Sequence, residues 1–271
     1  MTNLVVIMTK SVNNGEAMKV EKRQAKLVEI VRRNEKASVD ELASLLETSR
    51  ETVRRDLTHL SELGKILKVH GGARMPRVLG EGPFKQRLSE NISAKMEIAK
   101  AAAALVEPGE TLFIDTGSTT LFFAEAIAEV GDLTIVTNST EIARTIARAN
   151  TTSRAYLLGG EFSADNSQTI GTMAVTQIRS FRAHHVFLTI GAMDARTGAM
   201  DYNIAEAQIA RAMIEQSQTI TVLADASKLG ALASFEVCPL ASIDRFVTDR
   251  TPPPDILKVY EAGGGKVILA G

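Results

Sequence analysis

The chain has 271 residues, of which 45% are hydrophobic, 23% charged and 4% aromatic, and it contains no tryptophan. This composition can bury a globular core, and it excludes an intrinsically disordered, collagen-like or disulfide-stapled protein. The single cysteine, Cys238, cannot form an internal disulfide, which fits a reducing cytoplasm and excludes Cys-based zinc fingers and CxxC redox motifs.

Charge is divided unevenly along the chain, although the net charge is −1. Residues 19–80 hold 14 Lys/Arg against 9 Asp/Glu, whereas residues 81–271 hold 16 against 22. A basic block beside a more acidic remainder is typical of a nucleic-acid-binding module attached to another domain. Two ordinary solvated surfaces are the alternative that charge alone leaves open.

The N-terminal residues 1–18 show no periodicity, and we expect them to form a disordered extension. Their longest apolar run, Leu4 to Met8, has five residues. That is far fewer than the roughly 20 that cross a bilayer and too few for the core of a signal peptide. The sequence therefore predicts a cytoplasmic protein with no membrane partner.

Residues 19–73 predict three helices followed by a wing. The first helix spans about 20–34. Residues 38–41 and 48–51 each have the pattern of a capping box, so we expect the second and third helices to begin there. The third helix ends at Gly64, and residues 65–70 alternate into a strand that ends at two glycines. This order predicts a winged helix-turn-helix.

The predicted third helix has an apolar face and a cationic face. Its apolar residues recur at helical spacing and should pack against the first two helices; they are Val53, Leu57, Leu60 and Leu63. The opposite face and the wing carry the side-chain types that contact phosphates and base edges in DNA complexes. We expect DNA contacts from Ser49, Arg50, Thr52, Arg54, Arg55, Lys65, Lys68, His70 and Gly71. A three-helix packing module with a solvated charged face is the alternative.

The same segment resembles a known family of regulators. Residues 52–57 read TVRRDL, Leu60 and Leu63-Gly64 follow, and residues 69–73 read VHGGA. Together they resemble the N-terminal signature of the DeoR family of bacterial transcriptional regulators. Asp56 is a carboxylate beside two arginines, and we expect it to orient Arg55 or an adjacent helix and not to touch DNA.

Residues 74–91 contain prolines and glycines without periodicity and are expected to form a linker. Beyond the linker, residues 92–271 alternate between helix and strand, which predicts an α/β domain with a mostly parallel sheet covered on both faces. The expected strands are 111–115, 133–137, 154–158, 185–190, 219–224, 243–248 and 267–269. The expected helices are 93–106, 119–129, 140–149, 172–180, 204–217 and 254–262.

Small and polar residues follow five of the predicted strands. Ligands in such sheets bind at the carboxyl ends of the strands, where free helix amides also favour anions. The loops concerned are 116–120, 137–139, 159–160, 191–192 and 225–228. Each loop alone is explained by a helix cap, a turn or a surface lysine. Together they predict a site for a phosphorylated sugar or polyol at one rim.

These loops extend the family resemblance to about residues 19–271. The segments DTGSTT at 115–120, TN at 137–138, GG at 159–160, GA at 191–192 and ADASK at 224–228 resemble the effector domain of DeoR regulators. The resemblance implies a fold similar to ribose-5-phosphate isomerase. It also implies a repressor, usually of sugar or polyol catabolic genes, that is relieved by a phosphorylated sugar intermediate.

The resemblance also implies which residues bind the effector. Phosphate would be held by Ser118, Thr119 and Thr120, with a cation from Lys228. Asp115, Asn138 and Gly191 would line the sugar end, and Gly117 and Gly160 complete the effector-binding set. The expected partners are double-stranded operator DNA, the phosphorylated effector and further copies of the chain, because single helix-turn-helix modules rarely bind tightly. A homodimer or homotetramer is therefore expected, at the bacterial nucleoid when bound to DNA.

A sugar-phosphate isomerase with an accessory N-terminal domain is the alternative function. Isomerisation needs a carboxylate base and a polar group that stabilises the enediolate. The acidic pair that brackets the Gly-Ala loop in isomerases is not matched, because Ile190 precedes Gly191 and Asp194 lies one position too far along. Asp115 and Glu206 stay open as alternative bases. Nucleotide-binding motifs and metal-ligand spacings are absent, so we expect no catalytic residue, cofactor or metal.

Overall fold

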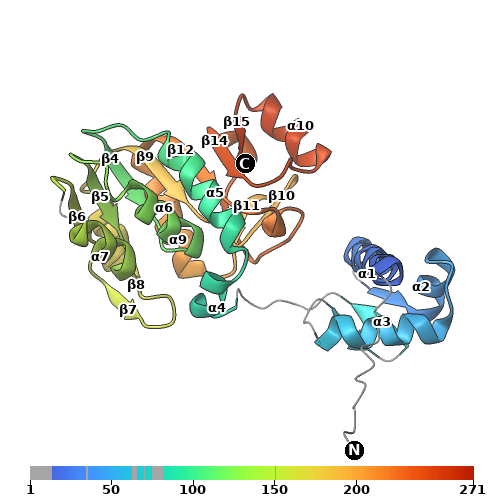
Figure 1. Ribbon diagram of the computed structural model, residues 1–271. Helices are drawn as coiled ribbons and strands as arrows, with labels where there is room; N and C mark the ends of the chain where they lie inside the picture. The colour runs from blue at the N-terminus through green and yellow to red at the C-terminus, as the bar shows by residue number, and fades with distance from the viewer. Residues whose placement is uncertain (1–13, 35, 63–65, 70, 75–81, 150) are drawn as a thin grey trace, which may run out of the picture. The chain divides into compact units, whose positions relative to one another are not determined.

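A computed structural model describes residues 14–271 except 35, 63–65, 70, 75–81 and 150. The chain divides into two compact units, residues 1–78 and 79–271, which Figure 1 draws in one view and which are described separately below. Within the described residues, no helix is both long and apolar enough to cross a membrane.

The first unit contains three helices and a small antiparallel sheet. In chain order its elements are α1 (Asn14–Asn34), β1 (Lys36–Ser38), α2 (Val39–Leu45), α3 (Arg50–Glu62), β2 (Leu67–Val69) and β3 (Gly72–Arg74). Strand β3 lies between β1 and β2. Helices α2 and α3 with the β2–β3 wing form the predicted winged helix-turn-helix. Strand β1 was not predicted, because it has three residues and is defined by pairing with β3, which is distant in sequence.

The first helix begins earlier than the sequence predicted. It starts at Asn14, so residues 14–18 are helical and the expectation of a disordered extension over them is wrong. Glu16, Ala17 and Met18 are good helix formers, which continue a helix without needing an apolar face. Residues 1–13 lie outside the described part of the chain.

The core of the first unit consists of apolar residues from all three helices, including Leu27, Val31, Leu42, Val53, Leu57 and Leu60. The capping box of α2 is confirmed, because the Ser38 hydroxyl accepts from the Glu41 amide and the Glu41 carboxylate accepts from the Ser38 amide. At α3 the cap is one residue later than predicted. The Ser49 hydroxyl accepts from the Thr52 amide at 3.1 Å. The predicted end of α3 at Gly64 lies outside the described residues.

The second unit is built on a seven-stranded sheet with the order β15-β14-β12-β9-β4-β5-β6, in which every neighbouring pair is parallel. The strands are β4 (Thr111–Ile114), β5 (Thr134–Thr137), β6 (Arg154–Leu157), β9 (Ala183–Leu188), β12 (Ser217–Leu223), β14 (Arg245–Thr248) and β15 (Lys266–Leu269). All seven predicted strands are therefore confirmed within a few residues.

Helices cover both faces of this sheet, as Figure 1 shows. The six expected helices are α5 (Ile92–Ala103), α6 (Ser118–Ile127), α7 (Thr140–Arg148), α8 (Thr172–Ile178), α9 (Ile204–Glu215) and α10 (Pro254–Ala262). Alternation along β4 sends Leu112 and Ile114 into a core with α5, α6 and α7. Phe113 enters a second core with α8, α9 and α10. Both faces are thus buried, as apolar parallel strands require.

Short elements outside the main sheet were not predicted. They are the hairpin β7 (Glu161–Ser163) and β8 (Gln168–Ile170), the small sheet of β10 (Ala192–Asp194), β11 (Gly198–Asp201) and β13 (Phe235–Cys238), and two 3-10 turns at Ala226–Lys228 and Leu240–Ser242. Helix α4 (Phe84–Ser89) lies inside the segment 74–91 that was expected to be a linker. The expectation fails there because Phe84 is buried and α4 contacts α6.

The strand order locates the place where a ligand would bind. From the central strand β4 the chain runs outward to β5 and β6, then returns to the other side of β4 to form β9, β12, β14 and β15. The order therefore reverses between β4 and β9. Ligands in open parallel sheets bind outside the carboxyl ends of the strands at such a reversal.

Candidate functional sites

The exposed face of α3 carries three arginines. The side chains of Arg50, Arg54 and Arg55 are 66%, 60% and 79% exposed. Arg50 pairs with Asp40 at 2.7 Å, and both other guanidiniums lie within 4.0 Å of Glu51. Exposed ion pairs of this kind contribute little stability. The guanidiniums can therefore exchange these carboxylates for the phosphates or bases of DNA.

The wing lies beside the same face of α3. The Lys68 ammonium of β2 donates to the Thr58 hydroxyl of α3 at 3.0 Å, and that hydroxyl donates to the Arg54 carbonyl at 2.9 Å. Gly71, in the turn before β3, has a φ of +76°, which favours glycine. The Ser49 and Thr52 hydroxyls lie 2.9 Å apart at the start of α3. Seven of the nine predicted DNA-contacting residues thus lie on α3, its cap and the wing, while Lys65 and His70 lie outside the described residues.

Asp56 lies on the same helix as these arginines, but its side chain bonds to α1. Its carboxylate is buried and accepts from the Arg23 guanidinium at 2.6 and 3.1 Å and from the Gln24 amide at 2.9 Å. The hydrogen bond to Asp56 raises the pKa of Arg23 above its usual value. Asp56 therefore orients the adjacent helix α1, one of the two predicted alternatives. Arg55 pairs with Glu51 instead.

A pocket lies at the carboxyl ends of β4, β9 and β12. The segments that follow these strands, including the first turn of α6, contribute Ser118, Thr119, Thr189, Ile190, Asp225, Ser227 and Lys228. The opposite wall comes from α4, α5 and the residues between them, namely Arg87, Glu90, Asn91 and Lys95. The pocket brings together three of the predicted effector-binding residues, Ser118, Thr119 and Lys228.

Lys95 is the buried cation of this pocket. It is 4% exposed, and burial lowers the pKa of its ammonium, while the negative charge of Asp225 opposes that shift. Its Nζ donates to the Arg87 carbonyl. Sequence reasoning missed Lys95, although a signal existed: Lys95 stands in the same helical stripe as Ile98, Ala99 and Ala102, which are all buried. A charged residue within an apolar stripe marks a site with a special environment.

Asp115 does not line the pocket itself but is buried and bonded to Thr189, which does. Both carboxylate oxygens are 3.1 Å from the Thr189 amide, which joins the ends of β4 and β9. Burial raises the pKa of Asp115 well above its usual value, and the negative charges of Asp201 and Glu206 raise it further. Gly117 is closely packed against the same residue, since a Cβ on Gly117 would stand 2.9 Å from the Cβ of Thr189 and overlap its hydroxyl.

Four predicted effector-binding residues bond within the protein or lie away from the pocket. The Thr120 hydroxyl donates to the carbonyls of Asp115 and Gly117. The Asn138 amide donates to Gln168 and to the Thr169 carbonyl. Gly160 packs against Ile170 and Ala174, and the Gly191 amide donates to the Met200 carbonyl. Strand β9 ends at Leu188, so Thr189 and Ile190 face the pocket where Gly191 was expected.

A chain of hydrogen bonds nevertheless links Asn138 to the pocket wall. Gln168, which accepts from Asn138, donates to Glu206 at 2.6 Å. Glu206 also accepts from Asn166, whose oxygen accepts from the Arg87 guanidinium at 3.2 Å. Polar networks of this kind fix side-chain orientations in a low-dielectric environment. Glu206 is thus bound to two amide side chains at 2.6 Å each.

Among the described residues, no group of three or more His, Cys, Asp or Glu side chains is placed to hold a metal ion. The lone thiol is also unsuited to chemistry. Burial raises the pKa of Cys238 to about 12, so the thiolate that reacts or ligates metals is not populated at neutral pH.

Two family models match the chain, one for each unit. The DeoR-like helix-turn-helix domain matches residues 23–77, and the DeoR C-terminal sensor domain matches residues 90–250. The second match alone covers more than half of the chain.

Curated relatives match over most of their length. The repressor CsqR of Escherichia coli is 32% identical over 232 residues, which cover 86% of this chain and 88% of that protein. The glycerol-3-phosphate regulon repressor of the same organism is 31% identical over 89% of this chain and 96% of its own. The regulator GolR of Listeria innocua is 29% identical over 92% of this chain and 98% of that protein. Among solved structures, ribose-5-phosphate isomerase A of Neisseria gonorrhoeae is similar over 49% of this chain and 52% of its own, at 19% identity and a TM-score of 0.37.

Proposed function

This chain belongs to the DeoR family of transcriptional regulators, and on that premise we propose that it represses genes for the breakdown of a sugar or polyol until a phosphorylated intermediate binds. The observation that carries the proposal is the pocket at the reversal of the sheet. It combines the hydroxyls of Ser118 and Thr119 with the ammonium groups of Lys95 and Lys228. Hydroxyls, a helix N-terminus and cations are the groups that bind phosphate.

The DNA-binding step is assigned to α3 and the wing. One or two of Arg50, Arg54 and Arg55 read base edges in the major groove, as arginine does with guanine. Lys68 and the residues at the start of α3 bind phosphates, and DNA contacts are also assigned to Lys65, His70 and Gly71. Much of the affinity then comes from released counterions, so it falls steeply as salt concentration rises.

The effector-binding step is assigned to the pocket of the second unit. Arg87 on α4 joins Ser118, Thr119, Lys95 and Lys228 around the phosphate, which extends the predicted site by two cations. Two relatives support the choice of ligand class, since they are named as a glycerol-3-phosphate regulon repressor and a putative aga operon repressor. The remaining predicted residues Asp115, Gly117, Thr120, Asn138, Gly160 and Gly191 do not line the pocket, although Asp115 and Gly117 contact its residue Thr189.

Repression also requires more than one copy of the chain. Helix-turn-helix proteins bind tightly when two modules occupy symmetric half-sites. We therefore propose a homodimer or homotetramer that acts at the bacterial nucleoid in the cytoplasm.

A mobility-shift titration tests the proposed function. Purified protein is bound to the DNA directly upstream of its own gene and then titrated with sugar and polyol phosphates beside their unphosphorylated forms. Release by a phosphorylated compound and not by its unphosphorylated form is the expected result, and it identifies the effector. Specific binding that no phosphorylated compound changes contradicts the effector assignment, and absence of specific binding contradicts the DNA assignment.

A further inference from the structure

Helix α4 is the first described helix of the second unit, and its last turn forms part of the pocket wall. Arg87 lies in α4, and Glu90 and Asn91 follow it directly. We propose that α4 carries ligand occupancy to the DNA-binding unit, and that the Lys95 ammonium is a latch which the ligand's phosphate releases. This inference rests on the proposed function, because it needs a phosphorylated ligand in the pocket.

Hydrogen bonds from pocket residues hold α4 in place. The Lys95 Nζ donates to the Arg87 carbonyl, and the Arg87 guanidinium donates to the Asn166 side chain at 3.2 Å. Just after α4, the Asn91 amide donates to the Asp225 carboxylate at 3.2 Å, while the Asn91 backbone has a φ of +52°. A left-handed asparagine is mildly strained and persists where its surroundings hold it. The bonds that position α4 are therefore made by groups that a ligand would contact.

Among the described residues, α4 has one buried side chain and contacts α6. The helix has six residues, far fewer than the roughly 12 to 15 that form a marginally stable isolated helix. Its buried anchor is Phe84, and the Arg87 guanidinium lies 5.5 Å from the centre of that ring. The hydrogen bonds at the pocket therefore contribute to the position of α4, together with Phe84 and the contact with α6.

A phosphate changes the balance of these bonds. A hydrogen bond from an ammonium to a charged phosphate oxygen is stronger than one to a neutral carbonyl. Lys95 therefore turns from the Arg87 carbonyl to the ligand, and the Arg87 guanidinium is drawn from Asn166 into the pocket. The ligand therefore binds the state with α4 released more tightly than the state with α4 held. A ligand can shift the population between two states only through such a difference in affinity.

Release of α4 explains relief of repression. While α4 is held, the chain that leads into the DNA-binding unit starts from a fixed point on the second unit. Two modules in an oligomer can then keep the separation that two half-sites require. Once α4 is released, that separation is no longer fixed and operator affinity falls.

Amide hydrogen exchange of the full chain tests the latch, with inorganic phosphate as the probe and sodium chloride at equal ionic strength as the control. Thermal unfolding is followed in parallel to detect phosphate binding. We expect phosphate to raise the unfolding temperature and to speed exchange in a peptide spanning residues 83–91 at least about fivefold. Exchange in α10 should not become faster. A raised unfolding temperature with unchanged α4 exchange overturns the latch and leaves the site intact. If phosphate does not raise the unfolding temperature, both the latch and the proposed phosphate site are contradicted.

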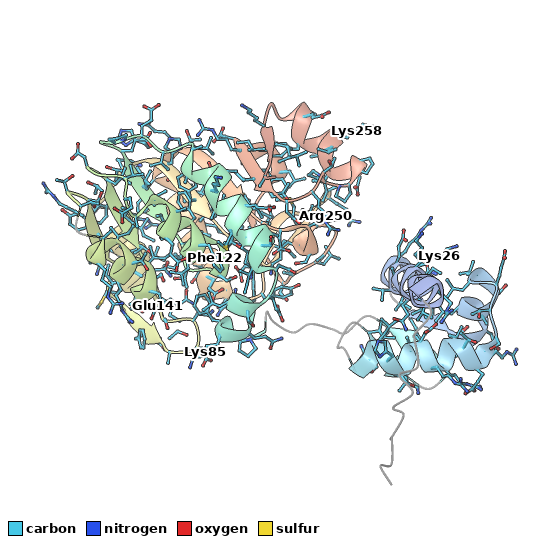
Figure 2. All side chains as sticks on the ribbon, in the orientation of Figure 1. Lys26, Lys85, Phe122, Glu141, Arg250 and Lys258 are labelled. Atoms are coloured by element: carbon cyan, nitrogen blue, oxygen red, sulfur yellow. The ribbon has the colours of Figure 1, made fainter. Side chains whose placement is uncertain are left out.

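A matched pair of variants tests the latch without ligand. Asn166→Ala, in the turn between β7 and β8, removes one acceptor of the Arg87 guanidinium, which also donates to the Gly82 carbonyl, and should speed α4 exchange severalfold in the absence of phosphate. Lys85→Ala changes an exposed side chain of α4, labelled in Figure 2, and should leave that exchange unchanged. Equal exchange in Asn166→Ala and the unaltered protein overturns the proposed role of the Arg87 tether.

Discussion

The Asp56 carboxylate of α3 is bonded to the Arg23 guanidinium of α1 through two hydrogen bonds that span 33 residues of sequence. Asp56 is buried, and it stands between Arg55 and Leu57 on the helix that is assigned to DNA. A buried carboxylate with three donors fixes the rotation of α3 relative to α1. The direction in which the arginines project therefore depends on an acid that does not itself face DNA.

Replacing this acid should destabilise the first unit. Asp56→Ala leaves the donors of Arg23 and Gln24 without their acceptor, at a cost of about 1–3 kcal/mol. Hydrogen exchange in α1 and α3 measures the loss. Asp40→Ala is the control, since its pair with Arg50 is exposed and should change exchange little. An Asp56→Ala variant as stable as Asp40→Ala would show that the bonded pair does not hold the helices.

Arg54→Ala should weaken binding to the operator by roughly 10- to 100-fold, the cost of losing a guanidinium that contacts a base. Fluorescence anisotropy with labelled operator DNA measures the change. Arg250→Ala removes an exposed arginine of the second unit, labelled in Figure 2, and serves as the control. Unchanged affinity in Arg54→Ala refutes the assignment of this α3 face to DNA.

Lys68→Ala should weaken binding to all DNA sequences alike. Each lost phosphate contact lowers the slope of log affinity against log salt by about 0.9. Titrations on operator and unrelated DNA at several salt concentrations measure that slope. Lys258→Ala, an exposed lysine of α10, should leave the slope unchanged. A sequence-specific loss in Lys68→Ala would instead assign Lys68 to base recognition.

The Lys228→Ala variant should bind the operator normally but bind the effector more weakly. Loss of a charge-assisted hydrogen bond costs about 1.5–3 kcal/mol, so the effector concentration needed for release rises roughly 10- to 100-fold. Isothermal titration calorimetry with the compound found by mobility shift measures the affinity directly. Lys100→Ala, an exposed lysine of α5, is the control. Full sensitivity to the effector in Lys228→Ala removes this lysine from the site.

Asp115→Asn should make the protein more stable at neutral pH, because folding then no longer requires a buried carboxyl to take up a proton. The pKa of Asp115 is raised in the folded state, so the folded state holds this proton after the unfolded state has lost it. Stability from this group is therefore lost as pH rises from about 4 through the folded pKa. The advantage of the variant should be greater at pH 7.5 than at pH 4.5 in thermal unfolding. An equal advantage at both values contradicts a protonated Asp115.

The main sheet was predictable because its strands are apolar runs between helices with apolar stripes, and these patterns are local. The three-residue strand β1 was not, since it pairs with β3, which is distant in sequence. Strands β7 and β10 pair with the next strand along the chain, but three residues are too few to show an alternation of apolar and polar side chains. Helix α4 was missed for a similar reason. Its one buried residue, Phe84, gives no periodicity and is explained only by contact with the folded unit.

The candidate pocket was predictable on the side formed by strand ends. Ser118, Thr119 and Lys228 follow strands directly, and parallel strands bring their ends to one rim. The wall formed by Arg87 and Lys95 was missed, because it comes from a segment that precedes the first strand of the sheet. No local sequence pattern shows that this segment packs beside the carboxyl ends of the strands.

The close approach of Gly117 to Thr189 constrains how the pocket can change in evolution. A Cβ at position 117 would overlap the side chain of Thr189, which lines the pocket, so position 117 admits no side chain while Thr189 is in place. Selectivity for a new compound must therefore arise by substitution in the walls, at positions such as Glu90, Asn91 and Ile190. The residues that bind the phosphate would then stay the same, while the walls change to accept a different sugar or polyol.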